Sequence, residues 1–396
     1  MTILCIASYE KGHEFLKEAK RVGCHVLLLT SLSLKETAEW PSEIDEIFYM
    51  PDVNKVWNRT HLLNSVAFLA RTHHIERIVP LDDFDLELAA YLREHLRVSG
   101  LGESETRLFR DKLAMRMQAR ESGLPIPDFT PVIHHGRLNE WTSRVPTPWV
   151  LKPRLLAGAM GIRKVHSSEE LWGYLDQFGD QQSFYLLERF LPGDIYHVDS
   201  MVCDGEIRFA QASKYGRPPL EVSHGGGIFT TRLLERGSAE EGMLLDLNAR
   251  VLQSFGMRRG VSHTEYIRAH EDGQFYFLET SARVGGAHIA DLVEAATGVN
   301  LWRKWARLEV CEGTVEAQRT KQDYGGLLVS LARQEWPDLS VFDAPEVVWR
   351  MRRKHHVGLI VTSPSLGRVE QLLEEYTDRV ARDFHAVAPP RDTPPD

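Results

Sequence analysis

Two glutamates and an arginine, spaced as metal and phosphate chemistry would need, occur in the third quarter of the chain. Glu265 lies in the stretch SHTEY, Glu279 in FLETS, and Arg283 four residues after Glu279. The two stretches are typical of neighbouring strands joined by the turn HEDGQ, so their carboxylates are expected on one face. Carboxylates that close repel each other unless a cation lies between them, and Mg²⁺ prefers oxygen ligands. The alternative is a strand pair whose acids simply face water.

Groups suited to binding an anion follow the second glutamate. Arg283 carries a planar guanidinium that matches phosphate or carboxylate oxygens. Gly285 and Gly286 permit close approach of the backbone, just before a stretch expected to be a helix whose N-terminus favours an anion. A metal site beside an anion site indicates phosphoryl-transfer chemistry.

A further candidate for phosphate binding is Lys152, which interrupts the apolar stretch WVLKP. An unpaired ammonium within an apolar strand is costly. The small-residue loop AGAMG, with Gly158 and Gly161, follows the strand and is typical of a flap that closes over phosphates. The other interpretation is a lysine at a strand edge with its ammonium in water. The Walker pattern GxxxxGK[ST] is absent from the chain.

Two features are candidates for substrate binding. His263 lies two residues before Glu265 and so shares its face of the strand, where it would orient a substrate or the metal ligands. A packed histidine explains this position equally well. The segment 214–232 contains three consecutive glycines. We interpret it either as a lid over the site, with Arg232 binding a carboxylate, or as a flexible connector.

The elements that must position these residues change along the chain. In the first hundred residues, apolar runs alternate with amphipathic helical patterns, which predicts a parallel sheet covered on both faces. A Rossmann dinucleotide site is not predicted, because ASYEKGH after the first strand holds only Gly12 where G-x-G-x-x-G is needed. The middle region is predicted to be α+β, with hairpins turning at Asp204-Gly205 and Asp272-Gly273.

Composition limits the class of protein. The chain has 396 residues, 43% hydrophobic and 26% charged, as expected for a globular protein of two or three domains. The net charge of -9 argues against general nucleic-acid binding. Four scattered cysteines without a CxxC pair make zinc binding and a disulfide framework unexpected. No apolar run reaches the roughly 18 residues of a membrane span, and no secretion signal is recognised, so a cytoplasmic protein is expected.

In their order and spacing these stretches resemble the ATP-grasp carboxylate–amine ligases, from about Leu81 to Thr297. RDKLAMRMQARESGLPIPDF resembles the helix that opens the family's nucleotide-binding domain. WVLKPRLLAGAMGI resembles its lysine strand and glycine-rich flap, and YLLERFLPGDIYHVDS its hinge strand. HTE and LETSARVGG resemble its two metal-binding strands.

The resemblance implies contacts to ATP. Lys112 and Lys152 correspond to lysines that contact the phosphates, with the flap glycines above them. In the hinge stretch, Glu188 and the following backbone correspond to the adenine contacts, and Asp194 or His197 to the ribose contacts.

The resemblance also implies a metal site. Glu265 and Glu279 correspond to ligands of Mg²⁺, with Mn²⁺ as an alternative ion. The family usually reads E-x-N-x-R at the second strand, whereas this chain carries Ser281 in place of the asparagine. A hydroxyl binds Mg²⁺ more weakly and reaches less far than an amide oxygen, so binding of a second metal is where this chain departs from the pattern.

The implied activity is ATP- and magnesium-dependent ligation of a carboxylate to an amine through an acyl phosphate, with release of ADP and phosphate. SHTEY most resembles the branch that joins amino acids into dipeptides. The candidate catalytic residues are Lys152, Glu279 and Arg283, and the candidate substrate contacts are Arg232, His263, Gly285 and Gly286. Small-molecule carboxylates and amines are the expected partners, and a homodimer is one option for the assembly.

Two alternatives remain open at this point. One is a purine-pathway or carboxylase-type enzyme of the same fold. The other is a nucleotide-binding module without ligase activity, which Ser281 favours.

The predicted fold class is α/β and α+β multidomain, with the ATP-grasp fold between two flanking parts. The predicted segments are an N-terminal α/β domain at 1–110, a lid domain at 111–190, a metal-site domain at 191–320, a closing β-rich subdomain at 321–385 and a disordered tail at 386–396.

Overall fold

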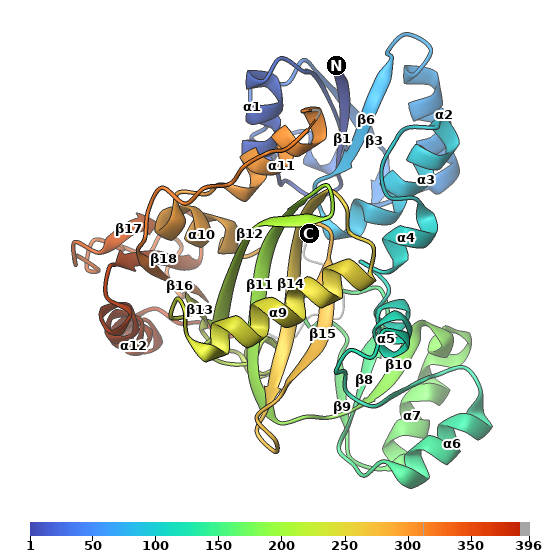
Figure 1. The fold of residues 1–396 in the computed structure, drawn as a ribbon, viewed down its shortest axis with the longest axis vertical. Coiled ribbons are helices and arrows are strands. Elements are labelled where there is room, and N and C mark those ends of the chain that lie inside the picture. Colours follow the sequence, from blue (N-terminus) through green and yellow to red (C-terminus); the bar gives the residue numbers. More distant parts are fainter. Residues whose placement is uncertain (312, 389–396) are drawn as a thin grey trace.

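Three large sheets carry the fold, and each comes from a different part of the chain (Figure 1). The computed structural model describes residues 1–311 and 313–388. Helices cover the sheets, and a two-stranded ribbon adds a small fourth sheet.

The first sheet is parallel, as predicted, with the strand order β3-β2-β1-β6. Alternate residues of β1 face opposite sides: Ile3 and Cys5 pack towards α1 and α11 (Leu301–Val310), and Leu4 and Ile6 towards α2 and α3. Burial on both faces explains why these strands are continuously apolar. The elements of this region are β1 (Thr2–Ala7), α1 (His13–Arg21), β2 (His25–Ser31), η1 (Leu32–Leu34), β3 (Glu46–Met50), β4 (Asp52–Val53), β5 (Val56–Trp57), α2 (Arg59–Leu69), β6 (Ile75–Pro80), η2 (Asp83–Asp85) and α3 (Leu86–Leu96).

The second sheet is smaller and antiparallel, with the order β7-β10-β8-β9. Helices α6 and α7 bury one face of it around Trp141, Trp149 and Leu171. The elements of this region are α4 (Glu103–Arg107), α5 (Lys112–Glu121), β7 (Phe129–Pro131), α6 (His135–Arg144), β8 (Trp149–Pro153), β9 (Arg163–Val165), α7 (Ser168–Phe178), η3 (Gly179–Phe184) and β10 (Tyr185–Arg189).

The third sheet has eight strands in the order β15-β14-β11-β12-β13-β16-β18-β17. Helix α9 crosses one face (Figure 1) and packs on Tyr266 and Phe277. The elements are β11 (Gly193–Cys203), β12 (Glu206–Tyr215), α8 (Pro219–Gly225), β13 (Phe229–Leu233), α9 (Ala239–Ser254), β14 (Gly260–Ala269), β15 (Phe275–Ser281), α10 (Ile289–Thr297), α11 (Leu301–Val310), β16 (Tyr324–Leu331), β17 (Val347–Arg350), β18 (His356–Ser363) and α12 (Leu366–Asp383). Because β13 pairs with β16, the closing strands extend this sheet and form no separate one.

One prediction about an irregular segment was wrong. The segment 214–232 is no long loop, since α8 lies between β12 and β13. Pro219 starts α8 with a fixed helical φ, and Gly226, at a φ of 64°, follows its last residue. At the start of the predicted tail, Ala386 donates a backbone hydrogen bond to Leu331 (3.0 Å). The rest of the predicted tail, 389–396, lies outside the described residues.

The first domain is fastened to the large sheet through α1 and α11, which lie side by side (Figure 1). Two ion pairs join these helices, Arg303 to Glu14 and Arg307 to Glu18 (2.5 and 2.6 Å). Apolar side chains of both helices share one buried cluster with the parallel sheet, including a Phe15–Trp305 edge contact.

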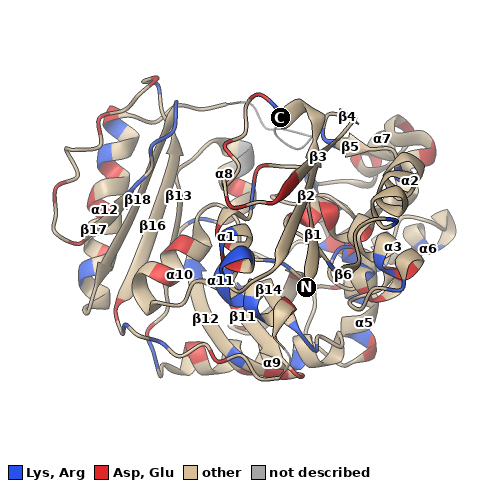
Figure 2. Cartoon of the chain, turned by 90° about the horizontal axis from the view of Figure 1, so that it is seen from above, with Lys and Arg blue, Asp and Glu red and all other residues tan. Residues whose placement is uncertain are grey.

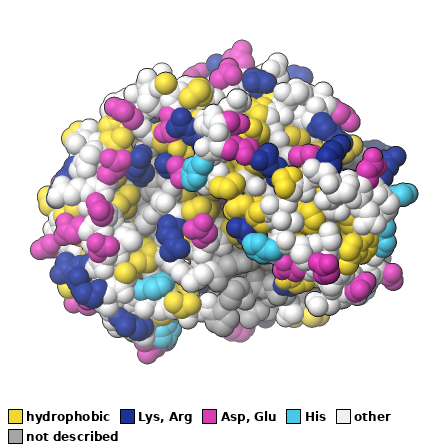
Figure 3. Space-filling model, turned by 90° about the horizontal axis from the view of Figure 1, so that it is seen from below, with side chains coloured by type: hydrophobic (Ala, Val, Ile, Leu, Met, Phe, Trp, Pro, Cys, Tyr) yellow, Lys and Arg dark blue, Asp and Glu magenta, His cyan; other side chains and the backbone are white. Residues whose placement is uncertain are grey.

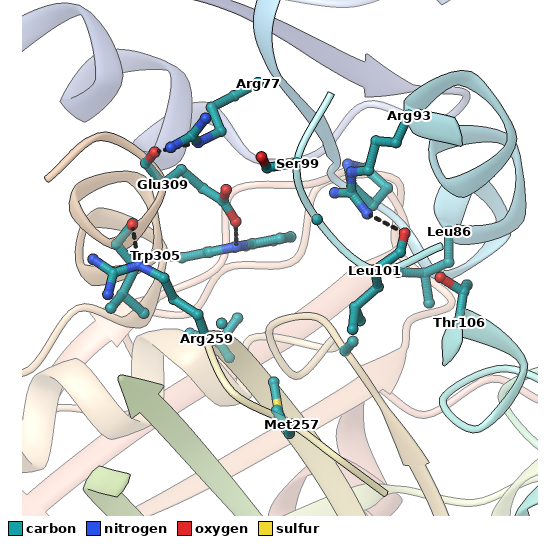
Figure 4. A pocket seen from close by; sticks show the side chains of 16 residues that line it. Arg77, Leu86, Arg93, Ser99, Leu101, Thr106, Met257, Arg259, Trp305 and Glu309 are labelled. Carbon is teal, nitrogen blue, oxygen red and sulfur yellow. Dashed lines mark hydrogen bonds between the residues drawn. The ribbon is translucent and has the colours of Figure 1, made fainter. Parts of the chain in front are cut away.

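A cavity of about 250 Å³ lies along the same seam (Figure 4). Several of the polar side chains shown there bond within the protein. Arg93 donates to the carbonyls of Ile78 and Leu101, and Trp305 donates to the Glu309 carboxylate (2.9 Å). We therefore interpret this cavity as part of the contact between the first domain and the large sheet.

The surface carries both signs of charge. Lysines, arginines and acidic residues are interspersed on outer helices such as α12 (Figure 2). The face in Figure 3 is hollowed beside its centre, with basic, acidic and histidine side chains near the hollow. Within the described ranges, no helix is both long enough and apolar enough to cross a membrane.

Gly193, the first residue of β11, tests how tightly the large sheet is paired. A Cβ atom there would meet the backbone oxygen of Arg268 and lie 2.7 Å from Cγ1 of Ile267. Gly193→Ala should lower the free energy of unfolding by about 1–3 kcal/mol, because backbone of a paired strand cannot move aside cheaply. Chemical denaturation measures this. The control is Gly242→Ala in α9, where a Cβ meets nothing within 4 Å, and a gain of about 0.5–1 kcal/mol is expected. Equal effects of the two substitutions would contradict the prediction.

Candidate active site

The register of three neighbouring strands gathers polar side chains on one face of the large sheet. Strand β14 pairs with β11 on one side and with β15 on the other. Two rows of three side chains result: His197, Glu265 and Glu279, then Asp199, His263 and Ser281. Side chains two residues apart on a strand share a face, so both rows point the same way. The prediction that the two glutamates lie on one face is confirmed.

One oxygen of Glu265 is held by the protein. The Tyr215 hydroxyl donates to Oε1 (2.8 Å), and Nε2 of His263 lies 3.7 Å from the same atom. Burial opposes the charge of Glu265, but His263 and Tyr215 outweigh it and lower the pKa of this carboxyl. The glutamate is therefore ionised and oriented, as a metal ligand must be.

Glu279 is joined by Lys112 to the region that contains the second sheet. The ammonium of Lys112 lies 2.8 Å from Oε2 of Glu279 and donates to the carbonyl of Leu156 (2.6 Å). Lys112 is the first residue of α5, which Asp111 caps by accepting from the backbone N–H of Leu113. This lysine thus connects the edge of the large sheet with the small-residue loop after β8.

Lys152 and Glu188 lie together in a buried ion group that also contains Arg116. Oε1 of Glu188 is 2.6 Å from Nε of Arg116, and Oε2 is 2.5 Å from the ammonium of Lys152. Burial alone would raise the pKa of Glu188, yet the two cations lower it. Arg116 also donates to the carbonyl of Leu278 on β15 (2.5 Å). The carboxylate of Glu188 is thus bound inside the protein. The contact with adenine that was predicted for this stretch would therefore be made by the backbone that follows Glu188.

Ser281 and Arg283 meet an aspartate from the first domain. The Ser281 hydroxyl donates to Oδ1 of Asp83, and Nε of Arg283 lies 3.8 Å from the same oxygen. Arg110 donates to the other oxygen (2.9 Å). Burial opposes ionisation of Asp83, but Arg110 and Arg283 lower its pKa. Although burial disfavours the cation, nearby carboxylates, Asp83 first among them, raise the pKa of Arg283.

Asp199 lies between the two histidines of the polar rows. Nδ1 of His197 is 2.8 Å from Oδ2 of Asp199, and Nδ1 of His263 is 2.9 Å from Oδ1. Burial lowers the pKa of His263, but Asp199 and Glu265 raise it to about 9, so the imidazole is positively charged at neutral pH. A Cβ at Gly285 would lie 2.6 Å from Oδ1 of Asp199. The close backbone approach predicted at this glycine is therefore to Asp199.

The structure separates two predicted site residues from this group. Asp194, at the start of β11, pairs with Lys214 (2.8 Å) and is half exposed. Arg232 pairs with Glu370 of α12 (2.7 Å). Their predicted contacts with ribose and substrate remain predictions.

The glycines differ in what surrounds them. Gly158 and Gly161, in the loop between β8 and β9, have φ values of 65° and 64°, which favour glycine. A Cβ at Gly158 or at Gly286 would meet nothing within 4 Å, so both positions are open.

Several residues of the group were not predicted. Asp83, Arg110, Arg116, Asp199 and Tyr215 all bond to predicted site residues or to one another. One signal was available for Asp83, because it follows an apolar strand of a parallel sheet, where ligands collect at the carboxyl end. Asp199 follows His197 by two residues, which places both on one face of the strand, but this spacing alone belongs to no recognisable motif. The sequence therefore carried no specific signal for Asp199.

The buried ion group offers a test of the arrangement. Glu188→Gln should lower the free energy of unfolding by about 3–5 kcal/mol, because Arg116 and Lys152 lose their shared carboxylate. The matched control is Glu271→Gln, whose half-exposed pair with Arg189 (2.6 Å) should contribute less than about 1 kcal/mol. Denaturant unfolding without nucleotide measures both. A Glu188→Gln protein as stable as the control would show that the two cations do not depend on this carboxylate.

We compared the sequence and the structure of this chain with those of known proteins. No known protein-family model matches the chain. Its sequence is 25% identical over 273 residues to the L-arginine-specific L-amino acid ligase of Bacillus subtilis, covering 67% of this chain and 64% of that ligase. The match therefore spans slightly less than two thirds of that relative's own length.

Solved structures match nearly the whole chain. An L-amino acid ligase from Bacillus licheniformis superposes with a TM-score of 0.77 at 16% identity, over 98% of each chain. An N5-carboxyaminoimidazole synthetase from Staphylococcus aureus, complexed with ADP, superposes with a TM-score of 0.72 at 12% identity, over 94% of this chain and 96% of that one. This protein therefore has the ATP-grasp fold, as its sequence predicted, and its sequence is similar to that of an amino acid ligase.

Proposed function

We propose that this protein is an ATP- and magnesium-dependent ligase that activates a carboxylate as an acyl phosphate and joins it to an amine. The observation that carries the proposal is the pairing of Glu265 with Glu279 on one face of the sheet. Lys112 and Arg283 lie beside this pair. Adjacent acids for a metal and adjacent cations for phosphates are what phosphoryl transfer requires.

The residues present fit a magnesium ion. Glu265 and Glu279 are directly opposite each other, and the contacts to Tyr215 and His263 engage only Oε1 of Glu265. These two glutamates would hold the ion, with Ser281 as a weaker oxygen donor already bonded to Asp83. When bound, the ion neutralises charge on the phosphates of ATP.

The lysines supply the phosphate contacts. Lys112 and Lys152 are each paired with a glutamate, and anionic phosphates would compete with these glutamates for them. Gly158 and Gly161 allow the loop above to approach the phosphates closely. The adenine and ribose would lie along the hinge strand that contains Glu188.

The substrate carboxylate needs no general base, because it is already an anion at neutral pH. Alignment and charge neutralisation supply the catalysis. The carboxylate oxygen attacks the γ-phosphorus of ATP, and ADP leaves. The amine then attacks the acyl carbon, loses a proton and expels phosphate. Arg283 would stabilise the transferred phosphoryl group and then the oxyanion, and the charged His263 would orient the substrate.

Amino acids are the substrates we propose, and the cytoplasm is the proposed location. The support for amino acids as substrates is the similarity to an enzyme named as an L-amino acid ligase. The alternative is a carboxylating or purine-pathway enzyme of the same fold, since an N5-carboxyaminoimidazole synthetase superposes almost as well. A nucleotide-binding module without ligase activity is the second alternative, because Ser281 replaces the usual asparagine.

The test is phosphate release from ATP and Mg²⁺ against a matrix of amino-acid pairs, with products identified by mass spectrometry. We expect ADP and phosphate only with particular pairs, together with a product lighter than the pair by one water. Turnover stimulated by bicarbonate instead would favour the carboxylating alternative. ATP binding without turnover, converted to turnover by Ser281→Asn, would favour the module that lost its activity.

Glu279→Gln tests the metal site directly. ADP formation should fall at least about 100-fold, because an amide replaces one carboxylate ligand while the strand pairing is kept. The control Glu271→Gln changes the same atoms in the turn of the same hairpin, where the side chain pairs with Arg189, and should leave the rate unchanged. Similar rates for both variants would mean that Glu279 does not hold the ion.

A further inference from the structure

Two histidines and a glutamate meet at an edge of the parallel sheet far from the polar rows. His25 is the first residue of β2, Glu46 is the first residue of β3, and His73 lies in the connection from α2 to β6. These positions are at the amino ends of parallel strands. Asp83, which contacts the candidate active site, follows the carboxyl end of β6. The cluster and the candidate active site therefore lie at opposite ends of the strands of this sheet.

The three side chains direct their free atoms towards one another. Oε1 of Glu46 lies 3.3 Å from Nε2 of His25 and 3.0 Å from Nε2 of His73. The two imidazole rings are stacked within 8° of parallel. Ligand atoms bound about 2.0–2.1 Å from one tetrahedral zinc ion are separated by roughly 3.3 Å. The two separations from Glu46 therefore fit a shared ion, and all three ligand atoms lie within 4.8 Å of one another.

The ring nitrogens of His73 both have partners. Nδ1 lies 3.2 Å from the carbonyl oxygen of Leu69, which can only accept, and 3.1 Å from the hydroxyl of Thr72. When Nδ1 donates to the carbonyl, Nε2 of the neutral ring presents a lone pair to the carboxylate of Glu46, 3.0 Å away. A metal ion or a proton fits between these two acceptors.

His25 is oriented in the same way. Its Nδ1 lies 3.5 Å from Oδ2 of Asp45, while its Nε2 faces Glu46. In protein metal sites a ligating histidine donates its other ring N–H to a carboxylate or a carbonyl. Nδ1 of His73 has a carbonyl at hydrogen-bond distance, and Nδ1 of His25 lies beside the carboxylate of Asp45 at an ion-pair distance.

We propose that His25, Glu46 and His73 together bind one transition-metal ion, with Zn²⁺ as the leading candidate and water completing the coordination. Two imidazoles and one carboxylate suit Zn²⁺ and not Mg²⁺, which prefers oxygen ligands throughout. The three side chains are 43%, 42% and 20% exposed, so an ion and a water can reach them.

The bound ion acts as a clamp on the first domain. It joins the starts of two adjacent strands to the connection after α2, which lies on one face of the sheet. Its effect is therefore on the stability of this domain. The absence of paired cysteines made zinc unexpected from the sequence, but this ligand set uses no cysteine.

The experiment uses the full chain, freed of metal by a chelator and titrated with Co²⁺ in excess Mg²⁺, which occupies oxygen-ligand sites. We expect one equivalent of Co²⁺ with the visible absorption of a tetrahedral site, displaced by Zn²⁺. His73→Ala and Glu46→Gln should weaken this binding at least about tenfold. The matched control is His74→Ala, which removes the exposed histidine next along the chain and should bind as the unaltered protein does.

A second readout is thermal unfolding with and without Zn²⁺. The melting temperature of the unaltered protein and of His74→Ala should rise with Zn²⁺, and that of His73→Ala should not. Circular dichroism of the metal-free variants checks that they fold. Unchanged binding in both His73→Ala and Glu46→Gln would place the ion elsewhere, and failure to bind one equivalent would show that protons hold the cluster. Either result overturns the proposal.

Discussion

The candidate site depends on one constraint, which is that each of the buried carboxylates Glu188, Asp83 and Asp199 has a basic side chain beside it. Glu188 lies between Arg116 and Lys152, Asp83 accepts from Arg110, and Asp199 lies between two histidines. In most of these groups the partners come from different elements. The same contacts that neutralise charge therefore hold the small antiparallel sheet, the large sheet and the first domain together around the candidate site.

Strand register turns this constraint into a site. Because β11, β14 and β15 are in register at the six polar positions, their side chains form two rows on one face, while α9 packs on apolar residues of the other. A slip of one residue in β14 would move Glu265 and His263 to the apolar face. The clash of a Cβ at Gly193 with the neighbouring strand shows how closely this pairing is set.

The parallel sheet contributes differently at the two ends of its strands. At the carboxyl ends it supplies Asp83, which contacts Ser281 and Arg283. At the amino ends of its strands lies the cluster of His25, Glu46 and His73, which has no contact with the polar rows among the described residues. The first domain thus combines a part of the candidate site with a separate feature suited to its own stability.

The sequence by itself determined the features that depend on local periodicity. Alternating apolar runs and helical patterns predicted the parallel sheet, and side chains two residues apart placed His263 and Glu265 on one face. Only the tertiary structure decided which distant segments meet. Ser281 and Asp83 are 198 positions apart, and the helix between β12 and β13 was predicted as a loop. Such contacts follow from the packing of whole elements, which no local pattern encodes.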